Sequence, residues 1–126
     1  MVPFATLPDG TGFVIHVSRL ASHTQDMTLD PNVSLLVMAL PTTHVPPQGL
    51  ARITIQGQAT QCVEPSQAHV QAKATYLARF PHSMEMFGFA DFSLFIVRPN
   101  SARFVGGFAQ ATSLSPAVLA RIICGG

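Results

Sequence analysis

The sequence has 126 residues and a formal net charge of +1, with 48% hydrophobic and only 10% charged side chains. This balance excludes the basic surface that nucleic-acid binding needs, and no uninterrupted stretch of about 18 apolar residues predicts a membrane span. Because charged residues usually form about a quarter of a domain, we expect part of the surface to be buried against a second copy of the chain, as a homodimer. The length fits one domain over residues 1–126.

The first predicted elements form a hairpin. A strand over 2–6, a turn at 8–10 and a strand over 13–17 follow one another. Since side chains alternate along a strand, the second strand has one face with Phe13, Ile15 and Val17 and another with Val14, His16 and Ser18.

A helix and two further strands complete the first half. We expect a helix over 21–29, an apolar strand over 33–40, a proline-rich loop over 41–49 and an alternating strand over 51–63. Gly57 is expected to mark a bulge or a bend in the last of these strands.

The second half begins with a helix over 64–79 and a helical turn over 82–87. Strands over 92–97 and 102–111 are predicted to pair as a hairpin, and a short helix over 116–123 ends the chain. Five to six strands in hairpins, with helices between some of them, predict an α+β fold that is mainly β, an antiparallel barrel with flanking helices.

The joint between the strand 13–17 and the helix 21–29 is the best candidate for a ligand site. Free N–H groups and the positive end of a helix dipole favour an anion at such a joint. The helix start supplies Ser22, His23 and Thr24, which can all donate hydrogen bonds. This stretch therefore points to a phosphorylated ligand.

Five motifs, in order, carry a family resemblance: VPFATLPDGTGFVIHVSRLASHT, DPNVSLLV, ARITIQGQA, YLARFP and DFSLFIVRPNSARFVGGFAQA. The chain resembles the pyridoxamine 5'-phosphate oxidase-like, FMN-binding split barrels, and within them the branch that contains the haem-utilisation flavoproteins. The resemblance covers nearly the whole chain. It implies a split antiparallel barrel with FMN at the interface of a homodimer. Family members usually carry a further N-terminal helix and first strand, so the chain looks N-terminally short.

In that family the FMN phosphate is held by the end of the second hairpin strand, the following turn and a basic residue on a neighbouring strand. By matching position, the resemblance implies these cofactor-binding residues: His16, Val17, Ser18, Ser22, His23, Thr24 and Arg52. The oxidases usually have an arginine-lysine pair where this chain has Ser22 and His23. They also end in a basic, tryptophan-containing segment, whereas this chain ends in ARIICGG. Both departures argue against a plain pyridoxamine phosphate oxidase.

Each of these residues also has a structural alternative. Arg52 could form a surface salt bridge, and the hydroxyl side chains could cap the helix. His23 could be a solvated histidine, and His16 could either lie along a flavin or pack inside the barrel. Arg19 is expected on the surface or in the dimer interface rather than as a ligand.

The remaining reactive side chains give weaker signals. Cys62 and Cys124 have no metal-binding spacing, and no secretion signal is visible, so we expect two reduced thiols in a cytoplasmic protein. His44, His69 and His82 are expected on the surface; a haem ligand among them stays open. Gly106-Gly107-Phe108 favours a bulge over a close backbone approach. Core and dimer contacts are expected from Phe87, Phe89, Phe92, Phe95, Phe104 and Phe108.

No nucleophile and base stand in a recognisable arrangement, so the sequence gives no support to a hydrolase. The leading hypothesis from the resemblance is an FMN-dependent oxidoreductase that transfers a hydride to or from a small substrate. The alternative is a non-enzymatic flavin- or haem-binding module for haem handling, storage or sensing.

Overall fold

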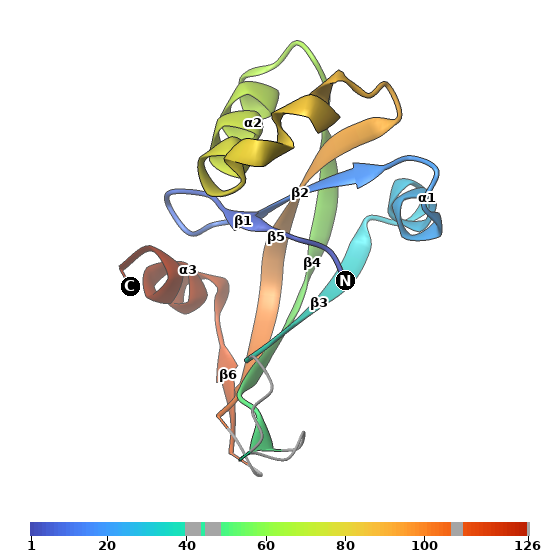
Figure 1. Cartoon of the computed structure of the whole chain (residues 1–126). Helices are drawn as coiled ribbons and strands as arrows, with labels where there is room; N and C mark the ends of the chain where they lie inside the picture. Colours follow the sequence, from blue (N-terminus) through green and yellow to red (C-terminus); the bar gives the residue numbers. More distant parts are fainter. Residues whose placement is uncertain (40–43, 45–48, 107–109, 126) are drawn as a thin grey trace.

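The computed structural model describes residues 1–39, 44, 49–106 and 110–125. They form one antiparallel sheet of six strands in the order β1-β2-β5-β4-β3, with β6 paired to β5 (Figure 1). The strands are β1 Ala5–Thr6, β2 Phe13–Ser18, β3 Asn32–Met38, β4 Arg52–Cys62, β5 Phe92–Val105 and β6 Ala111–Leu114. The helices are α1 Ser22–Leu29, α2 Gln67–Arg79, α3 Pro116–Gly125 and the 3-10 helix η2 Pro81–Gly88. The predicted fold class is therefore confirmed.

The sheet has a side chain cluster on each face, and the alternation predicted for β2 is confirmed. We call the two faces the inner face and the α2 face. Buried on the inner face are Phe13, Ile15, Val17, Ile55, Ala59, Phe95, Val97, Ala102 and Leu119 of α3. Buried on the α2 face are Leu7, Val14, Cys62, Leu94 and Ile96, with Ala72 and Tyr76 of α2.

β5 corrects the sequence prediction. We expected two strands over 92–97 and 102–111, paired as a hairpin, but Phe92–Val105 is one continuous strand. Pro99 lies within it, where β4 shifts its register between Gln56 and Gly57. Gln56 pairs with Ser101 and Gly57 with Pro99, so the irregularity expected at Gly57 is present, but the extra residue is Asn100 of β5. A Cβ atom on Gly57 would lie closer than 3.0 Å to the Arg98 carbonyl oxygen, so the glycine permits this close approach of the two strands. The strand that turns back along β5 is β6.

The helices start and end at sequence signals. Ser66 caps α2, since its hydroxyl accepts the backbone N–H of His69 at 3.1 Å. Pro81 then begins η2, which confirms the helical turn expected over 82–87. None of the helices in the described part of the chain is long and apolar enough to cross a membrane.

The turn between β1 and β2 packs against the last helix. Gly10 has a φ of +74°, a conformation that L side chains rarely adopt. A Cβ atom there would also lie closer than 3.0 Å to the Ala120 carbonyl oxygen of α3. The turn predicted at 8–10 is thus confirmed, and it joins the first hairpin to the C-terminal helix (Figure 1).

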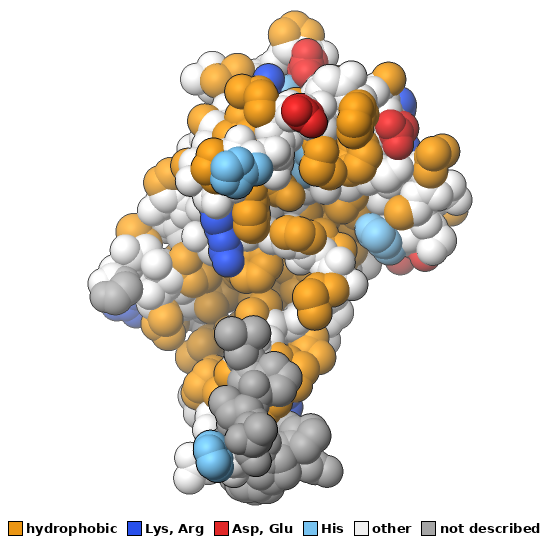
Figure 2. Space-filling view, in the orientation of Figure 1, with side chains coloured by type: hydrophobic (Ala, Val, Ile, Leu, Met, Phe, Trp, Pro, Cys, Tyr) orange, Lys and Arg blue, Asp and Glu red, His pale blue; other side chains and the backbone are white. Residues whose placement is uncertain are grey.

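Hydrophobic side chains remain on the surface over the middle of the molecule (Figure 2). Leu36 and Met38 of the edge strand β3 are 60% and 45% exposed, and Phe104 is 41% exposed. Of the phenylalanines expected in core or dimer contacts, Phe95 is buried and Phe89 is exposed. Phe87 and Phe92 are half-buried. Phe108, Gly107 and most of the loop predicted over 41–49 lie outside the described residues.

Candidate functional site

The joint between β2 and α1 is open to an anion at the start of the helix. Ala21 precedes the helix in an extended conformation, and no side chain caps the first turn. The N–H groups of Thr24 and Gln25 both bond to the Ala21 carbonyl, at 3.1 and 3.2 Å. Ser22 and His23 are exposed at the first turn of α1, where a bound anion would meet backbone N–H groups and the helix dipole.

Ser18 is held by a residue that the sequence analysis missed. Its hydroxyl donates to the Asp91 carboxylate at 3.0 Å and accepts the Leu20 N–H at 3.2 Å. Arg19 is tied to the same loop, because its backbone N–H bonds to the Asp91 carbonyl at 2.6 Å and its guanidinium to the Ala90 carbonyl. The hydroxyl of Ser18 is thus engaged beside a negative charge, which disfavours a phosphate at that oxygen.

His16 is enclosed by aromatic rings on the α2 face. Its ring stacks on Phe87 with centroids 4.0 Å apart and an interplanar angle of 9°. Tyr76 and Phe92 lie at 5.7 and 5.2 Å. The side chain is 7% exposed, and burial lowers the pKa of His16, with a further contribution from His69. The structure therefore places His16 as a neutral packing residue between the sheet, α2 and η2.

Val17 and Thr24 are both buried near the inner face. Val17 belongs to the inner cluster. Thr24 is 1% exposed, and its hydroxyl has no hydrogen-bond partner among the described residues. Thr28 donates its own hydroxyl to the Thr24 carbonyl at 3.0 Å. Thr24 therefore does not cap the helix, and its buried hydroxyl remains available to a ligand or a water molecule.

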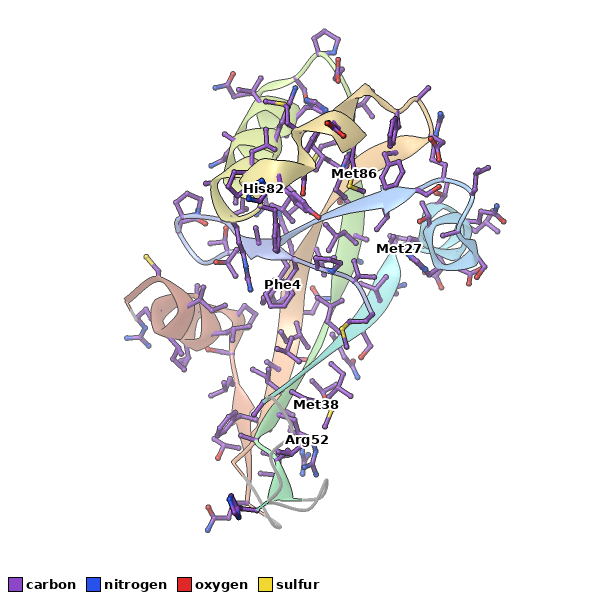
Figure 3. The ribbon with its side chains drawn as sticks, viewed as in Figure 1. Phe4, Met27, Met38, Arg52, His82 and Met86 are labelled. Carbon is purple, nitrogen blue, oxygen red and sulfur yellow. The ribbon has the colours of Figure 1, made fainter. Side chains whose placement is uncertain are left out.

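Arg52 lies far from the other predicted site residues. Ser18 pairs with Phe92 at one end of β5, and Arg52 pairs with Val105 at the other end. At about 3.3 Å per residue, the length of β5 separates them by about 40 Å. Figure 3 accordingly shows Arg52 well away from Met27 of α1. Arg52 donates to the Leu50 carbonyl at 3.2 Å and has a further interaction. One chain thus brings together Ser18, Ser22, His23 and Thr24, but not Arg52.

The described part of the chain contains no group of three His, Cys, Asp or Glu residues that could hold a metal ion. His69 pairs with the Glu64 carboxylate at 3.3 Å, and His82 is exposed on η2. Both cysteines are free; Cys124 is exposed, while burial raises the pKa of the Cys62 thiol.

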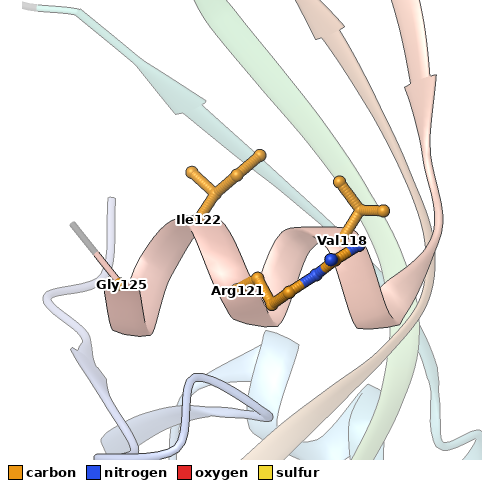
Figure 4. A pocket seen from close by; sticks show the side chains of 4 residues that line it. All are labelled: Val118, Arg121, Ile122 and Gly125. Carbon is orange, nitrogen blue, oxygen red and sulfur yellow. The ribbon is translucent and has the colours of Figure 1, made fainter.

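Two hollows on the described surface are considered as ligand sites. One of about 460 Å³ is formed by Val118, Arg121, Ile122 and Gly125 (Figure 4). Because all four belong to α3, it is a concave part of one helix surface. The other, of about 390 Å³, lies between α1 and the sheet.

No protein-family model matches the chain. Two known proteins with similar sequences are both named heme oxygenases. The chain is 39% identical over 111 residues to the chloroplastic non-canonical heme oxygenase HOZ of Arabidopsis thaliana, a match that covers 88% of this chain and 32% of the relative. It is 27% identical over 105 residues to heme oxygenase HutZ of Vibrio cholerae, covering 82% of this chain and 60% of the relative. The match thus spans about a third of the length of HOZ and about three fifths of the length of HutZ.

Solved structures agree with the fold. A heme binding protein from Mycobacterium smegmatis superposes with a TM-score of 0.81 at 27% identity, over 94% of this chain and 47% of that one. A general stress protein 26-related protein of the pyridoxinephosphate oxidase family, from Clostridium acetobutylicum, gives a TM-score of 0.53 at 6% identity, over 84% of this chain and 67% of that one. The chain therefore has the split-barrel fold of pyridoxine phosphate oxidase-like proteins, a fold that it shares with a haem-binding protein.

Proposed function

We propose that this chain is a haem-binding, split-barrel domain over residues 1–126 that takes part in haem breakdown. The observation that carries the proposal is its 39% identity over 111 residues to a non-canonical heme oxygenase. This function shares haem binding with the alternative that the sequence analysis kept beside its leading hypothesis, but that alternative was a non-enzymatic module, whereas haem breakdown is a reaction.

The described residues offer three exposed imidazoles to a haem iron, those of His23, His44 and His82. His16 is enclosed by rings and His69 pairs with a carboxylate, so neither is presented to a ligand. His23 on α1 and His82 on η2 are both exposed. Exposed apolar side chains that could contact a porphyrin ring lie in the same two segments: Leu20 precedes α1, and Met84 and Phe89 belong to η2 and its end.

Bound haem would supply its own redox chemistry through the iron, and the protein would control binding, orientation and access of water. This chain would hold the porphyrin ring against apolar side chains and present one imidazole to the iron. His23 or His82 would provide that imidazole.

An FMN-dependent oxidoreductase is the second candidate, and the uncapped start of α1 favours it. The phosphate would lie on the N–H groups of Ser22 and His23. Because Arg52 of the same chain is at the far end of β5, Arg52 would have to come from a second copy in a homodimer. The exposed apolar surface on β3 supports such a dimer.

Haem and FMN titrations of the purified chain separate the two candidates. Under the haem proposal, added haem gives a shifted, saturating Soret band, and a reductant in air then removes that band as a verdin absorbance grows. Replacing the iron-binding histidine, through His23→Ala or His82→Ala, should remove most of the Soret shift, whereas His69→Gln and the exposed His44→Ala should not. A Soret spectrum that stays that of free haem would reject the proposal, and quenching of FMN fluorescence would then favour the flavoprotein.

The dimer is tested separately by light scattering. A homodimer would have a mass near twice 13.5 kDa. A chain that stays monomeric at micromolar concentration would contradict the dimer and with it the completion of a flavin site by Arg52.

A further inference from the structure

The hollow between α1 and the sheet has the features of a built binding pocket, which we call the α1 pocket. It has a volume of about 390 Å³. Its walls are Arg19, Thr24, Gln25, Thr28, Leu29, Gln61 and Phe95. Apart from Thr24, none of the residues matched to an FMN phosphate lines it. The α1 pocket is therefore distinct from the open start of α1.

Helix and sheet geometry explain how these walls come together. Thr24 and Thr28 are four residues apart, as are Gln25 and Leu29, so the four side chains lie along one side of α1. Gln61 and Phe95 face each other across β4 and β5. Both belong to the inner face, because they alternate in step with Ala59 and Val97 of the inner cluster. The pocket is thus the end of the inner face that α1 covers.

Arg19 is the one charged side chain that lines the pocket. Its guanidinium donates to the Ala90 carbonyl, and it forms no ion pair with a carboxylate of the described residues. A guanidinium has five N–H donors, so several remain for a ligand. Because no described carboxylate pairs with it directly, this exposed guanidinium can contact an anionic ligand.

Thr24 provides a second, independent indication of a ligand. Its side chain is 1% exposed, lines the pocket, and carries a hydroxyl without a partner among the described residues. Buried polar groups in folded proteins are nearly always hydrogen-bonded, so such a hydroxyl calls for a partner that enters the pocket. The amide nitrogens of Gln25 and Gln61 donate to the Arg19 carbonyl and the Ser93 hydroxyl at 3.4 and 3.3 Å, and each keeps a second N–H.

The remaining walls limit the class of ligand. Phe95 and Leu29 are apolar and suit a hydrocarbon body. One guanidinium balances one negative charge, whereas a phosphate dianion would leave a charge uncompensated. We propose that the α1 pocket binds a small organic monocarboxylate with an apolar body, its carboxylate on Arg19 and Thr24 and its apolar part against Phe95 and Leu29. This proposal does not depend on whether the chain binds haem or FMN.

The first test uses the unaltered chain and three probes: 3-phenylpropionate, its neutral amide 3-phenylpropanamide, and inorganic phosphate. Amide signals are followed by 15N-edited NMR. We expect 3-phenylpropionate to cause saturating shifts at Thr24, Thr28 and Gln61, and to bind at least about tenfold more tightly than the amide or phosphate. Equal binding of the acid and its amide, shifts confined to other residues, or no saturation would overturn the proposal.

Variants then separate recognition from folding. Thr24→Val replaces the unpartnered hydroxyl with a methyl group of similar size, so the thermal midpoint should not fall while the affinity for 3-phenylpropionate drops about tenfold. Arg19→Gln should weaken binding at least as much, and Arg121→Gln on α3 serves as its matched control. If Thr24→Val left the affinity unchanged, the carboxylate would not lie where we place it.

Discussion

Acid should loosen the packing of α2 and η2 on the sheet through His16. The imidazole is 7% exposed, and its Nδ1 atom has no hydrogen-bond partner among the described residues. Burial first, and the charge of His69 second, lower the pKa of His16 below its usual 6.5. The ammonium group of Lys73 also lies 5.2 Å from the centroid of Phe87, the ring on which His16 stacks. The folded state therefore favours neutral His16.

The sign of the pH effect follows from proton binding. As the pH falls through 6.5, the unfolded chain takes up a proton on this histidine before the folded chain does. The free energy of unfolding therefore decreases with falling pH until the lower pKa of the folded state is reached. One proton gives a slope of at most about 1.4 kcal/mol per pH unit, and the contribution is fully present above the usual pKa.

Urea unfolding of the chain and of His16→Phe, between about pH 7.5 and pH 5, measures this effect. The phenylalanine keeps a ring against Phe87 but cannot titrate. The free energy of unfolding of His16→Phe, relative to that of the original chain, should therefore rise by up to about 1.4 kcal/mol per pH unit as the pH falls. His82→Gln, which changes an exposed histidine, should follow the original chain. Parallel curves for the original chain and His16→Phe would refute the reasoning.

Three further predictions concern stability and are measured by urea unfolding. Gly10→Ala should lower the free energy of unfolding by at least about 2 kcal/mol, because it combines a positive φ with a contact on α3. Gly88→Ala is the control and should cost far less, because its added Cβ atom meets open space. Similar losses for the two variants would argue against the contact with α3. Ser66→Ala should cost about 1 kcal/mol by removing the cap of α2, whereas Ser22→Ala removes no cap and should be nearly neutral. Ile55→Ala should cost about 2–5 kcal/mol, since Ile55 is buried in the inner cluster, and a loss below about 1 kcal/mol would contradict its place there.

Local periodicity was sufficient to predict most of the fold. The two faces of β2, the presence of α2 and the irregular pairing at Gly57 follow from patterns within a few residues, although α2 begins at Gln67 rather than at 64. The error in β5 arose because Pro99 lies where a strand break is normally expected. The strand stays continuous because its own extra residue, Asn100, is accommodated opposite Gly57 of β4, a long-range partner that the local sequence does not reveal.

The candidate site was predicted in part for the same reason. The strand-to-helix joint is local, and the sequence located it. The bond from Ser18 to Asp91 spans 73 residues, and the distance from the joint to Arg52 depends on the pairing of β5. The α1 pocket also escaped prediction, because Gln61 and Phe95 reach α1 only through that pairing. The one signal in the sequence for the bond between Ser18 and Asp91 was the position of this acidic residue just before a strand.

The edge strand β3 has a practical consequence for handling the protein. Within the part of the chain that the structure describes it pairs with β4 alone, and its seven residues include neither a charged side chain nor a proline. Natural sheets usually guard such edges with lysine, proline or a bulge, because exposed N–H and C=O groups recruit other strands. With Leu36 and Met38 exposed along it, β3 is the segment from which aggregation during expression or concentration would start unless another surface covers it.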